Sequence, residues 1–280
     1  MKANRISIAL LFLATVLFNV LLLGNIEEKS LQINCFPYET AYENLRAHTL
    51  PAAVADSFLE AADSNMDVYS ELLAMYFGTD CTVTEAKILQ QNISFVKKYR
   101  PADFEEIKSY VYALWSNLER FPVGEVLGDM NATVTFSDSW MQSRTYGGER
   151  GHEGTDIMAS VNERGIYPIY SISGGVVENI GWLRLGGWRI GIRSESGAYF
   201  YYAHMAEYAK DFQVGEQVSA GTFLGFMGDT GYSDTPGTYG NFPVHLHLGM
   251  YLKDKNGTEF SVNSYPMMRY LLEKQNSECM

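Results

Sequence analysis

The chain has 280 residues, which is enough for two modest domains or for one domain with attachments. It has 21 lysines and arginines against 33 aspartates and glutamates, so its formal net charge is −12. An acidic surface repels polyanions, and this balance argues against binding to nucleic acid. The three cysteines, Cys35, Cys81 and Cys279, do not make a disulfide framework. A Cys35–Cys81 bridge, a Cys81–Cys279 bridge and free thiols all remain open.

An almost unbroken apolar run covers residues 6–24 and follows Lys2 and Arg5. It is long enough to cross a bilayer as a helix. Positive charges precede the run and two glutamates follow it, so the positive-inside rule places the rest of the chain outside the cytoplasm. A cleaved signal peptide is the alternative, but no A-x-A-like stretch follows the run. We therefore predict cytoplasmic residues 1–5 and an uncleaved transmembrane anchor at 6–24.

Residues 25–120 are predicted to form a helical extracytoplasmic domain. Thr82 followed by Glu85 has the form of a capping box. The simplest interpretation of this domain is a small bundle that spaces the rest of the chain from the membrane, and binding of a partner or of glycan is the alternative. His48 is interpreted as an ordinary surface or capping histidine. Further helix-end signals occur at Pro51, Asn65 or Ser64, Gly78 and Pro101.

Short β-rich pieces with frequent glycine begin at Val134, with the spacing of an all-β domain. We assign residues 121–133 to a linker, because Phe-Pro-Val-Gly opens that stretch. Residues 134–265 are predicted to form the β domain. Residues 266–280 are predicted to be a C-terminal tail, with a short helix from Pro266 to Leu272 and a frayed end.

Two segments of the β domain are predicted to be groove walls. Residues 228–242 have no periodic apolar pattern and are rich in Gly, Ser, Thr and Asp, so we expect a loop. This loop leads directly into a histidine-containing strand, and long loops beside a site are often functional. Residues 146–150 are expected to line another part of the groove.

Residues 243–251 alternate histidine with aliphatic residues, which is the pattern of a half-buried strand. His245 and His247 are then neighbours on one face. Upstream, His152 precedes Asp156 by four residues, and His204 closes a strand of four aromatic residues. Three protein ligands of N and O type with an open fourth position are typical of catalytic zinc. The H-x-x-x-D segment and the H-x-H strand can supply them and leave two imidazoles free.

Three motifs in this order and spacing resemble those of the lysostaphin-type (LytM-like) zinc endopeptidases, which cut peptidoglycan peptides. The resemblance covers roughly residues 134–252, with no departure at the five polar positions. It rests on H-x-G-x-D at His152, Gly154 and Asp156, on Y-x-H at Tyr202 and His204, and on H-x-H at His245 and His247.

The resemblance implies a mostly antiparallel β-sheet domain of the lysostaphin/LytM type with an open groove. Together with the apolar run and the helix signals, this predicts a membrane-anchored α + all-β protein in which an N-terminal helical domain precedes the β domain. The resemblance also implies that His152, Asp156 and His247 bind one Zn²⁺ per chain. His204 and His245 would then be catalytic, one as base and one as stabiliser of the oxyanion, in an undecided order. We therefore predict a single-pass zinc endopeptidase of the bacterial cell membrane, whose partners are peptidoglycan stem peptides or cross-bridges.

Three alternatives remain at this point. The H-x-H pair could clamp one ion, and four protein ligands would then make a closed structural site. The domain could be a catalytically silent scaffold or regulator of another wall hydrolase, or it could bind glycan without cutting it.

Two further residues near the motifs have open roles. Arg150 could contact substrate or a carboxylate behind the metal, or it could be a solvated loop charge. Tyr202 is expected on the same strand face as His204, where it could shape the groove or serve in packing.

Overall fold

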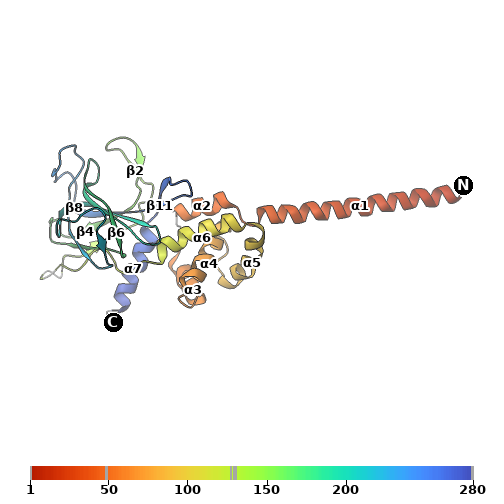
Figure 1. Cartoon of the computed structure of the whole chain (residues 1–280), viewed down its shortest axis with the longest axis horizontal. Coiled ribbons are helices and arrows are strands. Elements are labelled where there is room, and N and C mark those ends of the chain that lie inside the picture. The colour runs from red at the N-terminus through yellow and green to blue at the C-terminus, as the bar shows by residue number, and fades with distance from the viewer. Residues whose placement is uncertain (1, 48–49, 127, 129–130, 279–280) are drawn as a thin grey trace.

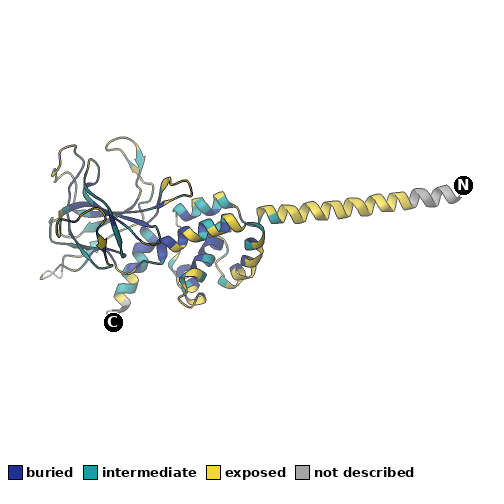
Figure 2. Ribbon diagram, in the orientation of Figure 1, coloured by how far each residue is buried: buried dark blue, intermediate teal, exposed yellow. Residues whose placement is uncertain are grey.

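The computed structural model describes residues 2–47, 50–126, 128 and 131–278. A long helix, a helical bundle and a β-sheet domain follow one another along the molecule (Figure 1). The first helix, α1 (Lys2–Asn34), projects away from the rest, and its side chains from Leu10 onward are nearly all exposed (Figure 2). By length and composition this helix could cross a membrane. Its exposed apolar surface is compatible with the predicted anchor.

The bundle is built around α4, whose residues 69–77 are all buried except the half-buried Glu71 and which contacts four other helices. Arg100 Nη1 donates a hydrogen bond to the Ile33 carbonyl oxygen, and Phe36 is buried in the core, so the end of α1 is joined to the bundle. The helices are α2 (Tyr38–Ala47), α3 (Ala52–Ala61), α4 (Met66–Gly78), α5 (Ala86–Tyr99) and α6 (Pro101–Trp115).

Most of the predicted helix ends are confirmed. Pro51 precedes α3, and Pro101 begins α6. The Asn65 side chain accepts hydrogen bonds from two backbone N–H groups of the first turn of α4, at 3.0 and 3.3 Å. The predicted capping box is wrong, because Glu85 itself is the N-cap of α5 and the Thr82 hydroxyl donates to the Thr79 carbonyl instead. His48 lies outside the described residues.

Cys35 and Cys81 are both free thiols, so the Cys35–Cys81 bridge is not formed. Burial raises the pKa of the Cys81 thiol to about 11, which keeps it protonated and weakly reactive. Cys279 lies outside the part of the chain that the structure describes.

Every strand pair found in the described residues is antiparallel, as predicted for the β domain. The main sheet has the order β1-β4-β11-β8-β7-β6-β9; β12 pairs with β11, and β10 pairs with both β5 and β8. The strands of this sheet are β1 (Val134–Thr135), β4 (Thr155–Ala159), β5 (Pro168–Tyr170), β6 (Gly175–Leu183), β7 (Gly187–Arg193), β8 (Tyr199–Tyr208), β9 (Gln217–Val218), β10 (Phe223–Met227), β11 (His245–Lys253) and β12 (Glu259–Val262). A separate hairpin consists of β2 (Ser143–Arg144) and β3 (Arg150–Gly151).

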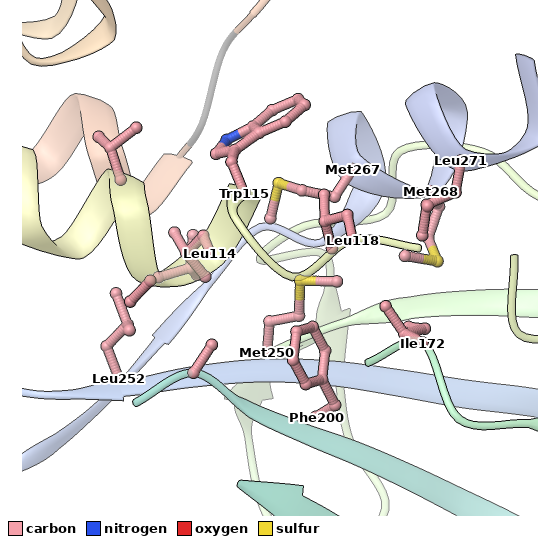
Figure 3. Close-up of a cluster of buried hydrophobic side chains, with 14 of the residues drawn as sticks. Leu114, Trp115, Leu118, Ile172, Phe200, Met250, Leu252, Met267, Met268 and Leu271 are labelled. Carbon is pink, nitrogen blue, oxygen red and sulfur yellow. The ribbon is translucent and has the colours of Figure 1, made fainter. Parts of the chain in front are cut away.

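The bundle and the sheet share one hydrophobic core. Figure 3 shows side chains from the end of α6 and from α7 (Tyr265–Glu278) meeting those of the sheet. The Trp115 and Tyr270 rings are 5.3 Å apart. The helix predicted at 266–272 therefore exists but is longer, and it packs in the core because Met267, Met268 and Leu271 form an apolar face. The core residues at this junction are Leu114, Trp115, Leu118, Ile172, Phe200, Met250, Leu252, Met267, Met268 and Leu271.

A polar cluster closes the same junction. The Tyr38 and Tyr110 hydroxyls donate to Glu106 Oε1 at 2.8 and 2.9 Å, and Lys255 Nζ lies 3.3 Å from Glu106 Oε2. These contacts join α2 and α6 to the turn between β11 and β12. The opposite face of the sheet is thereby left for the groove.

Candidate metal centre

Strand pairing brings the predicted metal ligands together. His247 on β11 lies directly opposite Asp156 on β4, and His152 directly follows β3, three residues before β4 begins. Their ligand atoms form a triangle: His152 Nε2, Asp156 Oδ1 and His247 Nδ1 are each 3.0 Å from the other two. His152 and His247 are 95 residues apart, and only the register of the sheet makes them neighbours.

The donor set fits a divalent transition metal. These three residues form a group whose ligand atoms can hold one ion. Two imidazole nitrogens and one carboxylate oxygen are typical zinc ligands, and one ion can reach all three at this spacing. Burial alone would raise the pKa of Asp156, but hydrogen bonds from His152 and His247 lower it well below its ordinary range. The carboxylate is therefore ionised, as a metal ligand must be.

Contacts behind the triangle hold two of the ligands in orientation. His152 Nδ1 lies 2.9 Å from the Ser139 hydroxyl oxygen, so its other ring nitrogen is turned toward the triangle. Arg144 Nη2 donates to Asp156 Oδ2 at 3.0 Å. From the sequence, Arg150 is the candidate for such a contact, but Arg144 makes it. The two arginines face each other across the β2–β3 hairpin, and nothing in the sequence distinguishes them.

Gly154 lets the third ligand pack closely against the chain. A Cβ atom at this position would lie 2.6 Å from the Leu248 carbonyl oxygen and 2.7 Å from His247 Cε1. The imidazole of His247 therefore occupies space that any larger residue would need. This is the structural reason for glycine between the histidine and the aspartate of the H-x-G-x-D motif.

A β-bulge brings His204 to the metal face. Two residues of β8, Ala203 and His204, lie opposite Arg189 on β7, where the register shifts. His204 has a φ of +62°, in the left-handed region that non-glycine residues rarely adopt. The extra residue reverses the alternation of side chains, so His204 leaves the face that Tyr202 occupies.

Tyr202 consequently serves in packing, which was one of its two predicted roles, but its predicted placement on the same face as His204 is wrong. It is fully buried, and its hydroxyl accepts a hydrogen bond from the Ile172 backbone N–H at 2.8 Å. Tyr199 and Tyr201 line the groove instead. Their alternation along β8 was visible in the sequence, but the bulge that separates them from His204 was not.

His204 and His245 lie beside the triangle in similar environments. His204 Nδ1 donates to the Thr230 carbonyl at 2.7 Å, and His245 Nδ1 donates to the Pro243 carbonyl at 2.8 Å. Their ring centroids are 4.7 Å apart, and His245 Nε2 is 3.8 Å from Asp156 Oδ1. Burial lowers the pKa of both imidazoles, so both are neutral at neutral pH with an unprotonated Nε2.

A groove of about 730 Å³ extends from the triangle across the sheet. The two segments predicted to be its walls meet at one end, where the rings of Tyr146 and Tyr232 stack with centroids 4.2 Å apart. Arg150 also faces the groove. The lining includes Arg150, His152, Asp156, Tyr199, Tyr201, His204, Tyr232, His245, His247 and Tyr251.

Residues 150–260 match the sequence profile of peptidase family M23. The L-Ala–D-Glu endopeptidase of Bacillus subtilis (strain 168) is 46% identical over 135 residues, which cover 48% of this chain and 40% of that protein. Lysostaphin of Staphylococcus simulans is 33% identical over 99 residues, or 35% of this chain and 17% of lysostaphin. The chain thus spans less than half the length of these two curated relatives.

A solved structure is similar over a larger part of the chain. It is that of a protein assigned as a glycyl-glycine endopeptidase lytM from Ruminococcus gnavus ATCC 29149, which is 38% identical with a TM-score of 0.68. The similarity covers 82% of this chain and 90% of the other. A match of this extent includes helical residues as well as the LytM-type β domain.

Proposed function

The chain belongs to peptidase family M23, and from this premise we propose that it is a zinc-dependent endopeptidase that hydrolyses peptide bonds of peptidoglycan. One observation carries the proposal. Two imidazole nitrogens and a carboxylate oxygen form a triangle with 3.0 Å edges, and two further neutral imidazoles stand beside it in an open groove. This arrangement combines a site for an ion with groups that can move protons.

His152, Asp156 and His247 would hold the ion. When bound, zinc supplies a Lewis acid that lowers the pKa of water to about 7 and polarises a peptide carbonyl. The Ser139 and Arg144 contacts keep two of the ligands in position, and such contacts behind a metal also tune its affinity.

His204 and His245 would carry the protons. Each Nδ1–H is fixed by a backbone carbonyl, so each Nε2 can accept a proton from the attacking water. An imidazole that has taken up a proton can then donate at Nε2 to the tetrahedral oxyanion or to the leaving amine. The two histidines have similar burial and the same tautomer, so the geometry does not decide which is the base and which stabilises the oxyanion.

The stem peptide is the substrate we propose first. The relative with 46% identity is named for the L-Ala–D-Glu bond, which lies in the stem. Lysostaphin is less similar. Cleavage of a cross-bridge is the second possibility within the same reaction class.

We further propose that α1 anchors the protein in a bacterial cell membrane as a single pass, with the groove outside the cytoplasm. The exposed leucine-rich surface of α1 supports the anchor, and peptidoglycan lies outside the membrane. The boundaries at residues 1–5, 6–24, 25–120, 121–133, 134–265 and 266–280 stay predictions. Phe121 and Val123, in the predicted linker, are buried against the sheet.

Three alternatives are less well supported. A silent scaffold or regulator would not need all five polar residues to converge on one groove. A closed structural site would need His245 as a fourth ligand, but its Nδ1 is engaged by the Pro243 carbonyl and it is not part of the group with closely spaced ligand atoms. A glycan-binding module without activity would bind peptidoglycan and release no product.

The test uses the full chain in detergent. Wild type is expected to contain about one zinc per chain, to release shorter peptides from peptidoglycan and to lose activity with a chelator. Asp156→Ala and His247→Ala should lose the metal, whereas His204→Ala should keep the metal and lose turnover. If His204→Ala also lost the metal, the assigned roles would be wrong. Mass spectrometry of defined muropeptides would identify the bond cleaved.

A further inference from the structure

Arg189 is a half-buried cation of the groove floor that the proposed metal site does not use. It lies on β7 and lines the groove, and its Nη1 atom is buried without a hydrogen-bond partner among the described residues. The two nearby groove carboxylates, Glu178 and Glu259, are both engaged by Arg193 at 2.6 and 2.9 Å. A buried guanidinium nitrogen without a partner loses its hydration and gains nothing in return. A ligand with a hydrogen-bond acceptor would give Arg189 Nη1 the partner that it lacks among the described residues.

Two glycines near Arg189 leave room for tyrosine side chains to lie flat against the sheet. A Cβ atom at Gly191 would overlap the Tyr199 hydroxyl, and one at Gly186 would overlap the Tyr201 hydroxyl. Both tyrosine side chains therefore extend over glycine backbone and leave open space above the sheet. Arg189 alternates with Trp188 and Ile190, so its side chain belongs to the groove face.

Arg189 is close to the catalytic end of the groove. Strand pairing places Arg189 opposite the bulge at Ala203 and His204, beside the pair formed by Ile190 and Tyr202. The Tyr201 ring centroid is 6.0 Å from that of His247. A peptide that lies over Tyr201 with its scissile bond at the triangle thus passes Arg189 within a residue or so.

The charge of the groove differs from that of the whole chain. The chain carries a net charge of −12, whereas the groove lining is balanced, with four arginines (Arg144, Arg150, Arg184 and Arg189) and four carboxylates (Glu153, Asp156, Glu178 and Glu259). Arg144 is paired with Asp156, and Arg150 Nε is buried without a hydrogen-bond partner in the part of the chain that the structure describes. A planar guanidinium binds a carboxylate through two parallel hydrogen bonds, which gives both affinity and orientation.

We propose that Arg189 is a specificity-determining residue that binds a free carboxylate of the stem peptide. The inference rests on the proposed function and narrows its substrate class. D-Glu is joined to the next residue through its side-chain carboxyl group, so its α-carboxylate is free beside the bond to L-Ala. Diaminopimelate carries another free carboxylate. A glycine bridge has neither, so this groove selects acidic stem peptides over polyglycine.

The test compares matched peptides with the zinc-loaded full chain. One stem peptide has both carboxylates free, a second has the D-Glu carboxylate amidated, a third has the diaminopimelate carboxylate amidated, and pentaglycine is the fourth. Amidating the recognised carboxylate is expected to lower kcat/KM at least tenfold for wild type, mainly through KM. Arg189→Gln should lose the same factor with the acidic peptide and cleave the amidated peptide at the wild-type rate. Arg189→Lys should recover part of the loss.

Arg269→Gln is the matched control, because Arg269 lies on α7 and pairs with Glu273. It should behave as wild type with all four peptides, and circular dichroism should show that each variant is folded. The inference is overturned if wild type cleaves the acidic and both amidated peptides equally, or if it prefers pentaglycine. If wild type cleaves nothing, the proposed function fails, and calorimetric binding of the same peptides to wild type and Arg189→Gln decides the inference separately. Equal binding of acid and amide forms would then overturn it.

Discussion

Gly154→Ala should weaken metal binding without removing any ligand. The new Cβ atom would lie 2.7 Å from His247 Cε1, so the ring must withdraw by about 0.7 Å to regain ordinary contact at 3.4 Å. The Leu248 carbonyl oxygen, at 2.6 Å, must withdraw by about 0.8 Å. Metal–ligand distances tolerate only about 0.2 Å. We therefore expect zinc affinity to fall by about 10–100-fold, the range seen when contacts that orient a ligand are lost.

The assay is competition for zinc against a chromophoric chelator, with the metal-free variant also unfolded in urea. Gly174→Ala is the control, because a Cβ atom there would meet no atom closer than 3.7 Å and the backbone φ is not in the left-handed region. Gly174→Ala should keep wild-type affinity. Wild-type affinity in Gly154→Ala would refute the argument that close packing at this glycine positions His247.

Three further changes test separate contacts. Arg144→Gln removes the charge that holds Asp156 and should lower zinc affinity by about tenfold in the same competition assay; an unchanged affinity would contradict the contact. Tyr202→Phe leaves the Ile172 backbone N–H buried without a partner, and urea unfolding should show a loss of about 1–3 kcal/mol with normal zinc content. The pKa of Glu106 is lowered: burial raises it, but hydrogen bonds from two tyrosine hydroxyls and a lysine outweigh burial. Glu106→Gln should therefore cost about 1 kcal/mol above pH 4.5, with a difference from wild type that shrinks as the pH falls below this value; a constant difference would be contrary evidence.

The convergence of the three proposed metal ligands could be predicted because strand alternation and motif spacing act together. Alternation along a strand places His245 and His247 on one face whatever the remaining fold is. The H-x-G-x-D spacing brings His152 and Asp156 together within one short segment. Pairing of β4 with β11 then joins the two groups, and this pairing came from the family resemblance rather than from composition.

The features that could not be predicted from the sequence depend on an irregular strand or on contacts between distant segments. The bulge at Ala203–His204 breaks the alternation, so Tyr202 was expected on the face of His204, whereas Tyr201 lines the groove and Tyr202 is in the core. Arg144 reaches Asp156 only because the β2–β3 hairpin folds over the sheet. The length of α7 was underestimated because its final turns are polar, whereas its beginning is held by a core shared with the bundle.

Because α1 continues beyond its apolar stretch, it determines how far from the membrane the groove lies. If residues 6–24 cross the bilayer, the helix continues through residues 25–34 before it joins the bundle. At 1.5 Å per residue this is a rigid post of about 15 Å. The bundle and the sheet share one core, so the bundle and the groove turn together at the end of this post. If the protein is anchored in this way, the peptides that it can cut are those within the combined reach of the post, the bundle and the groove.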